Sequence, residues 1–181
     1  MAANTEKATF DLLRDIERRS RANAHGLPEQ VEIQSAWAGI GFRVADAHLV
    51  APLGVIREIL TSPVLTRIPG AKVWMKGIAN VRGNLLPVTD LKGLLLGEST
   101  SVRQSTRILA VDNGTVSAGL LVDEVFGLRH FLDEDFSEGT EAVPGFIRRF
   151  INGVYVQHQE TWGKADLHAL IESDEFMQIA A

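Results

Sequence analysis

The sequence contains no cysteine, which excludes disulfide bonds, thiolate metal ligands and a cysteine nucleophile. It also lacks any long hydrophobic run. The longest aliphatic stretches, such as Leu94–Leu96, are far too short to span a bilayer. The first ten residues lack the apolar core of a signal peptide. These absences, together with a cysteine usage that fits a reducing compartment, predict a soluble cytoplasmic protein with no membrane insertion.

Positive charge is scarce as well. The chain has 18 Lys and Arg against 23 Asp and Glu, a formal net charge of −5. Nucleic-acid binders usually carry a basic stripe that releases counterions, and none is visible here, so no nucleic-acid partner is expected. The main charge cluster is acidic and contains no Lys or Arg: Asp133, Glu134, Asp135, Glu138 and Glu141. It favours a solvated loop, with a docking surface for a basic partner as the alternative.

Motifs of common catalytic and metal sites are missing from the sequence. Gly39-Ile-Gly41 lacks the third glycine of a dinucleotide loop, because Val44 stands there. The alternating acids after Asp133 fail as a calcium loop, since Glu138 replaces the required glycine and Pro144 the bidentate glutamate. The histidines are scattered, and no P-loop or hydrolase elbow occurs. We therefore expect no enzyme, no cofactor and no metal.

Glycine and proline, with 16 and 6 residues, lie mostly between short apolar runs, a distribution that favours many short strands. Asn113-Gly114 separates two such runs, and Asn152-Gly153 separates Phe150-Ile151 from Val154-Tyr155-Val156. Asn-Gly pairs accept the positive φ angles of type I′ turns. The pattern predicts two antiparallel hairpins and an all-β fold.

Both ends of the chain show helical patterns instead. At the N-terminal end, Thr9 can cap a helix over 9–25 with Phe10, Leu13 and Ile16 on one face, and Gly26-Leu27-Pro28 stops it. Asp15 and Arg19 form an i,i+4 pair in that helix. The apolar face predicts a helix that packs on the β domain, and the alternative is that the helix covers a surface left open in similar proteins or supplies a new one. A short tether follows. We expect a helical extension and tether over 1–35.

At the C-terminal end, Asp166 can cap a helix carrying Leu167, Leu170 and Ile171. Ser173 can cap a further short turn with Phe176. The β pattern and this C-terminal helix together predict one domain over 36–178.

The segment from Val73 to Leu96 contains the most specific pattern. Gly83-Asn84 can reverse the chain between two short strands, Pro87 places the second strand at an edge or a bulge, and Asp90 can cap a short helix. One interpretation is a plain hairpin in which Arg82 is a solvated turn residue. The other is that Arg82 projects from a rigid turn as an interface anchor, because its planar fork can bond and stack at once.

These residues resemble a known family. Gly77-Ile-Ala-Asn-Val-Arg-Gly83 and Pro87-Val-Thr-Asp-Leu91, with Val55–Ile59 upstream and Gly119–Val125 downstream, are similar to the signature of CheW-like domains. The resemblance covers about residues 36 to 178. The N-terminal helix, Trp37–Phe42 and Val73–Gly77 resemble in particular CheW-like adaptors of chemosensory systems that control type IV pili and twitching.

The resemblance implies two SH3-like β-barrels that share a core, with an N-terminal and a C-terminal helix and no active site. It implies two partners, the regulatory domain of a CheA-type histidine kinase and the cytoplasmic hairpin tip of a methyl-accepting chemoreceptor. A higher-order signalling array would also follow from it.

Carried over to this sequence, Asn80, Val81, Arg82 and Gly83 lie on or beneath the partner-binding surface, with Arg82 as the direct contact. Val55, Ile56 and Glu58 flank the receptor groove.

The alternatives are a coupling protein of another chemosensory pathway, such as flagellar chemotaxis, or a barrel module that binds a small ligand or a nucleic acid. Retention of a CheA-type kinase in a pull-down distinguishes the adaptor from such a module.

Overall fold

The computed structural model describes residues 14, 15, 17–19, 36–61 and 63–179. The chain divides into two units, Met1–Ile33 and Gln34–Ala181. In the first unit the described residues are helical, and the Asp15 carboxylate pairs with Arg19 at 2.7 Å, which confirms the predicted i,i+4 pair. The predicted cap at Thr9, the apolar residues Phe10, Leu13 and Ile16, the stop at Gly26-Leu27-Pro28 and the tether lie outside the described residues.

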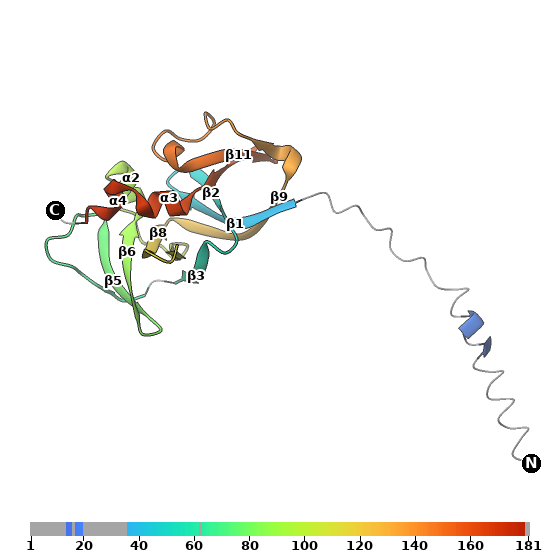
Figure 1. Ribbon diagram of the computed structural model, residues 1–181, viewed down its shortest axis with the longest axis horizontal. Helices are drawn as coiled ribbons and strands as arrows, with labels where there is room; N and C mark the ends of the chain where they lie inside the picture. Colours follow the sequence, from blue (N-terminus) through green and yellow to red (C-terminus); the bar gives the residue numbers. More distant parts are fainter. Residues whose placement is uncertain (1–13, 16, 20–35, 62, 180–181) are drawn as a thin grey trace, which may run out of the picture. The chain divides into compact units, whose positions relative to one another are not determined.

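The second unit contains two six-stranded sheets, which curl into two neighbouring lobes (Figure 1). Sheet A has the order β10-β11-β12-β2-β1-β9 and combines the first two strands with the last four. Its strands are β1 Ala36–Val44, β2 Ala47–Pro52, β9 Glu124–Leu132, β10 Phe136–Ser137, β11 Ile151–Gln157 and β12 Glu160–Ala165. Two short 3-10 helices, η1 (Asp133–Asp135) and η2 (Arg148–Phe150), precede β10 and β11.

Sheet B has the order β3-β7-β8-β6-β5-β4 and is built from the middle of the chain. Its strands are β3 Ile56–Leu60, β4 Leu65–Thr66, β5 Met75–Val81, β6 Asn84–Asp90, β7 Arg107–Asp112 and β8 Ser117–Val122. All pairings in the two sheets are antiparallel except β12 with β2 and β6 with β8. The predicted all-β class with two sheets is confirmed.

The predicted hairpin at Asn113-Gly114 is present, with β7 and β8 antiparallel from Asp112↔Ser117 onward. Its connection is not the two-residue turn expected. The Asn113 side-chain oxygen accepts the backbone N–H groups of Thr115 at 3.0 Å and Val116 at 2.7 Å, which organises a four-residue loop. Local side-chain hydrogen bonds of this kind compete with the simplest turn geometry.

The predicted hairpin turn at Asn152-Gly153 is wrong. Both residues lie inside β11, at an irregularity in its pairing with β12 between Ile151 and Val154. Gly153 has φ 143, and a Cβ there would lie 2.4 Å from the Phe136 ring. Glycine is therefore needed here to form the bulge and to let the Phe136 ring pack against the backbone. The chain reverses later, at His158 and Gln159, which both adopt positive φ.

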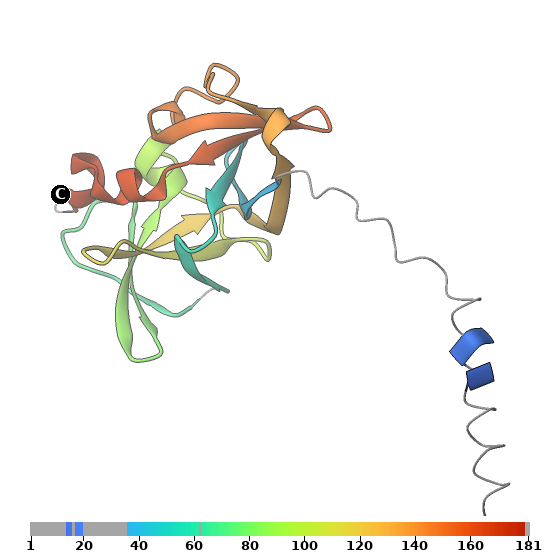
Figure 2. The ribbon, with the colours of Figure 1, turned by 45° about the vertical axis from the view of Figure 1, so that its right-hand side comes forward.

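Helix α2 (Leu91–Leu96) and the C-terminal helices α3 (Leu167–Glu172) and α4 (Asp174–Met177) begin at the predicted caps. Asp90, Asp166 and Ser173 each accept a backbone N–H at the start of their helix. Figure 2 shows α3 and α4 alongside both lobes. Among the described residues, no helix is long and apolar enough to cross a membrane.

The main core lies between the two sheets and is shared by them. Phe42 and Leu49 from sheet A pack with Leu109 and Leu120 from sheet B, and the α3 residues Leu167, Leu170 and Ile171 belong to the same cluster. Smaller clusters lie within each lobe, an aromatic one in sheet A around Phe131, Tyr155 and Trp162, and an aliphatic one in sheet B around Val88, Ile108 and Leu121. The predicted pair of barrels sharing a core, closed by a C-terminal helix, therefore agrees with the structure.

Candidate functional site

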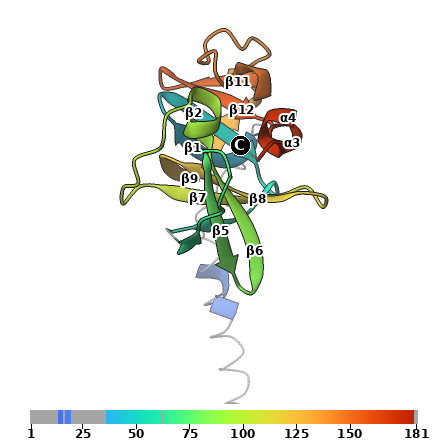
Figure 3. The same cartoon turned by 90° about the vertical axis from the view of Figure 1, so that its left-hand side faces the viewer.

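Arg82 lies at the tip of the β5–β6 hairpin, which projects from the rest of sheet B (Figure 3). Val81 pairs with Asn84, so the turn consists of Arg82 and Gly83, with φ 53 and 89. The chain therefore reverses one residue earlier than at the predicted pair, Gly83-Asn84. The Asn80 side-chain oxygen accepts the Gly83 N–H at 2.9 Å and fixes the turn. The Arg82 side chain is 80% exposed. The turn is stiff, and its arginine faces solvent.

Arg82 is held in place by a residue from another strand. Its Nη2 donates to Glu58 Oε1 at 2.8 Å, although Glu58 lies in β3, at the other side of the sheet order. An exposed pair of this kind contributes only about 0–1 kcal/mol to the free energy of folding. Its main effect is to orient the guanidinium over the space between the hairpin and β3.

That space is a groove of about 620 Å³, which we call the Arg82 groove. Its lining residues are Arg57, Glu58, Val81, Arg82, Asn84, Leu85, Leu86, Ala110, Val111, Asp112 and Ser117. Leu85 lies in this groove and is 70% exposed, so it presents an aliphatic surface there. The groove therefore combines an exposed apolar surface with two ion pairs, because Arg57 also lies 3.5 Å from Asp112.

Asp112 is the anionic group at the β7 side of this groove. Hydrogen bonds from the Ser117 hydroxyl and the Gly114 N–H, and then the charge of Arg57, lower the pKa of its carboxyl below the ordinary value. Asp112 therefore stays charged well into the acidic range. The groove presents fixed charges of both signs beside an apolar surface, which suits recognition of a polypeptide.

The structure brings some of the predicted site residues together and separates others. Glu58, Val81 and Arg82 line the groove, while Asn80 and Gly83 shape the turn above it. Val55 and Ile56 pack against the shared core and do not line the groove. Sequence reasoning missed Arg57, Leu85 and Asp112. A signal for Leu85 was available, because in β6 it alternates with the buried positions Leu86 and Val88 and so faces outward.

Asp90, the last residue of the second motif, is structural. It has no exposed surface and accepts hydrogen bonds from the Gly93 N–H at 3.2 Å, the Thr100 N–H at 2.8 Å and the Thr100 hydroxyl at 2.6 Å. Lys76 Nζ lies 3.0 Å from Asp90 Oδ2, the oxygen that also accepts the Thr100 N–H. Asp90 thus joins β5, β6, α2 and the loop that follows, and keeps the hairpin base rigid.

Pro87 lies in the same motif, within β6, which pairs with β5 on one side and β8 on the other. Of the predicted edge or bulge, the edge is therefore wrong for the strand as a whole, whereas the pairing of β5 with β6 does shift register opposite Val88 and Thr89, next to Pro87. However, pairing with β8 covers only Val88, Thr89 and Asp90. The missing N–H of Pro87 therefore removes no hydrogen bond to β8.

Within the described part of the chain, no group of three or more histidine and carboxylate side chains could hold a metal ion. The two curled sheets and their shared core define a double β-barrel module with an open groove beside Arg82.

Comparison with known proteins identifies the family. The model of the CheW-like domain matches residues 38–175, so the chain belongs to the CheW-like family. Members of this family are non-catalytic scaffold proteins of chemosensory systems, which confirms the predicted adaptor class.

Individual relatives agree. The chain is 44% identical over 171 residues to protein PilI of Pseudomonas aeruginosa, covering 94% of this chain and 96% of that one. It is 30% identical over 139 residues to the chemotaxis protein CheW of Rhizobium meliloti, covering 75% and 88%. The crystal structure of scaffolding protein TtCheW from Thermoanaerobacter tengcongensis matches with a TM-score of 0.67 at 23% identity, over 78% of this chain and 96% of that one. The last comparison supports the fold.

Proposed function

We propose that this protein couples the cytoplasmic hairpin tip of a methyl-accepting chemoreceptor to the regulatory domain of a CheA-type histidine kinase, in a system that controls type IV pilus twitching. Family membership supports the coupling role. The pilus assignment draws on the 44% identity to PilI across nearly the whole of both chains, against 30% to the R. meliloti chemotaxis protein CheW. A coupling role in another pathway, such as flagellar chemotaxis, is the alternative.

The observation that carries the proposal is the exposed Arg82 held by Glu58 over the apolar Leu85. An arginine pre-positioned in this way gives up little side-chain entropy when a partner binds. We assign Arg82 as the direct contact, with Asn80, Val81 and Gly83 presenting it and Glu58 holding it beside the receptor groove. Val55 and Ile56 then act from beneath, by fixing the start of β3 on the core.

We further propose that residues 36–178 form the adaptor domain and 1–35 a helical extension and tether. The protein would act in the cytoplasm, recruited to membrane receptors, and join a signalling array with them. A scaffold of this kind needs contacts that are modest and reversible, and an open groove with a few anchors fits that need.

The test is a binding experiment with purified CheA-type kinase and a receptor hairpin fragment from the same organism. Arg82→Asp is compared with Arg103→Asp, an exposed arginine outside the groove. We expect Arg82→Asp to weaken a partner's binding by on the order of tenfold or more, as loss of an interface hot spot does. Its melting temperature should barely change, because the Arg82–Glu58 pair is exposed.

A charge swap, Glu58→Arg with Arg82→Glu, separates two explanations. If Arg82 touches the partner, the swap restores the internal ion pair but not binding. If only the internal pair matters, the swap restores binding and removes Arg82 from the contact. Unchanged binding by Arg82→Asp to both partners would refute the assignment, while binding of neither partner by the unaltered protein would refute the coupling function itself.

A further inference from the structure

A second groove opens on another part of sheet B. It has a volume of about 610 Å³ and shares no lining residue with the Arg82 groove. Leu65, Met75, Ile108 and Leu121 line it, and Ile108 and Leu121 belong to the buried aliphatic cluster of sheet B. The groove is therefore the mouth of the sheet-B barrel, and we call it the barrel-mouth groove.

The rim of the barrel-mouth groove carries exposed apolar side chains. Val73 is 84% and Val102 67% exposed, and both line it. Val64, next to the lining residue Leu65, is 90% exposed. Single exposed aliphatic residues are ordinary, but a cluster around a concave apolar surface marks an interaction site. Because Val64, Val73 and Val102 are all largely exposed, an occupant that covers the three must extend along the surface beyond the buried floor, as a polypeptide segment does.

The charge of the groove is one-sided. Arg67, Lys72 and Lys76 line it, and none of the described lining residues is acidic, in a chain whose net charge is −5. The buried Asp90 carboxylate neutralises Lys76 at 3.0 Å, which leaves Arg67 and Lys72 as its positive charges. The Lys72 Nζ lies 6.0 Å from the centre of the Trp74 ring.

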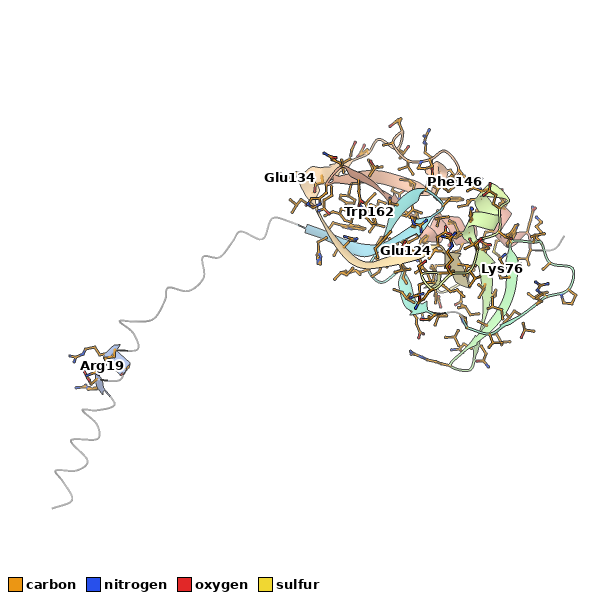
Figure 4. The ribbon with its side chains drawn as sticks, turned by 180° about the vertical axis from the view of Figure 1, so that it is seen from behind. Arg19, Lys76, Glu124, Glu134, Phe146 and Trp162 are labelled. Atoms are coloured by element: carbon orange, nitrogen blue, oxygen red, sulfur yellow. The ribbon has the colours of Figure 1, made fainter. Side chains whose placement is uncertain are left out.

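The acidic cluster from Asp133 to Glu141 cannot balance these charges. Figure 4 shows Glu134 and Lys76 at opposite ends of the β domain. At such a separation, exposed charges are screened by salt. This cluster therefore does not offset the charges of Arg67 and Lys72. Helix α4 ends nearer to Lys72, whose N–H donates to the Ile179 carbonyl at 3.0 Å, but of its two acids Glu175 is already paired with Arg149.

We propose that the barrel-mouth groove binds an acidic segment of a partner protein, which inserts an aliphatic or aromatic side chain between Val73 and Val102 and places its carboxylates beside Arg67 and Lys72. This gives the adaptor a docking site separate from the Arg82 groove. The inference rests on the groove's own residues and not on the proposed partners.

The test starts with random peptides displayed on phage and selected on the full-length protein. Affinities of the selected peptides are then measured by fluorescence anisotropy. We expect acidic peptides with at least one large apolar residue. Arg67→Glu should weaken their binding on the order of tenfold. Arg129→Glu, an equal charge change at an exposed arginine of β9 in sheet A, should leave it nearly unchanged. Val73→Ser should also weaken binding, and Val156→Ser, at an exposed valine in β11, should not.

The proposal is overturned if no peptide is selected, if the peptides lack acidic enrichment, if Arg67→Glu and Arg129→Glu act alike, or if Val73→Ser and Val156→Ser act alike. Dodecanoate is added as a separate probe of an anionic amphiphile. If dodecanoate shifts the amide NMR signals of Val73 and Val102 and displaces every selected peptide at equal concentration, the groove is a small-molecule site and the peptide proposal fails. Binding of the kinase and the receptor through Arg82 is measured in a separate assay. Failure of the peptide proposal would therefore leave the proposed coupling function untouched.

Discussion

Replacing Asp90 with alanine should destabilise the fold far more than its place at the start of a short helix suggests. The carboxylate has no exposed surface and accepts three hydrogen bonds, from Gly93 and twice from Thr100, besides its pairing with Lys76. Loss of the helix cap alone costs about 1 kcal/mol. Each buried Thr100 donor left without an acceptor adds about 1–3 kcal/mol, and breaking a buried ion pair by removing one partner costs about 3–5 kcal/mol in total.

We therefore expect Asp90→Ala to lower the free energy of unfolding by about 3–5 kcal/mol, a large part of the roughly 5–15 kcal/mol that holds a typical domain together. Urea denaturation followed by tryptophan fluorescence measures it. Asp166→Ala is the matched control, because Asp166 caps α3 by the same contact, to the Ala169 N–H at 2.9 Å, without full burial. That variant should lose only about 1 kcal/mol. Equal losses for both variants would show that the burial argument is mistaken.

Three further predictions concern other parts of the chain. Gly77→Ala should lower the free energy of unfolding by about 3 kcal/mol or more, because Gly77 has φ 138 and the added Cβ would lie 2.3 Å from the Thr66 carbonyl oxygen. Gly83→Ala, with open space around the added Cβ, should lower it by only about 1 kcal/mol in the same denaturation assay. Burial, and then the charge of Asp133, raise the pKa of the Tyr155 phenol. Because Tyr155 is the sole tyrosine, titration of the phenolate absorbance should report its pKa directly, above 10 in the folded protein and back to the ordinary value in urea. Because folding favours the neutral phenol, stability should fall as the pH rises past about 10, and Tyr155→Phe should remove that dependence; an ordinary pKa in the folded protein would contradict this. Deletion of residues 1–30 should leave a cooperative thermal transition, and its loss would show that the β domain needs the extension.

Features set by neighbouring residues could be predicted from the sequence. The caps at Asp90, Asp166 and Ser173 follow from short polar side chains placed just before apolar helical patterns. The hairpin at Asn113-Gly114 was predictable for the same reason, although its loop is longer than expected. Of the candidate site, the turn that presents Arg82 was predictable, because the Gly83 and Asn80 signals lie within a few residues of it.

Features set by distant residues could not be predicted in this way. Asn152-Gly153 is a dipeptide typical of hairpin turns, but the Phe136 ring packs beside Gly153 and the strand continues past it. The reversal falls instead on His158-Gln159, a pair without a strong turn signal. Likewise, the contact of Arg82 with Glu58 joins residues from strands that no spacing rule links. The groove lies between these two segments, so its position could not be predicted either.

The way the strands are divided between the sheets has a consequence for synthesis. Strands β3 to β8, which make all of sheet B, are contiguous and can pair as soon as they leave the ribosome. Strands β1 and β2 emerge first, yet β1 awaits β9 and β2 awaits β12 near the end of the chain. During translation the β1–β2 hairpin must therefore stay without its later neighbours for most of the chain's length. A premature stop after sheet B would release a product with apolar surface uncovered, a natural substrate for chaperones and proteases.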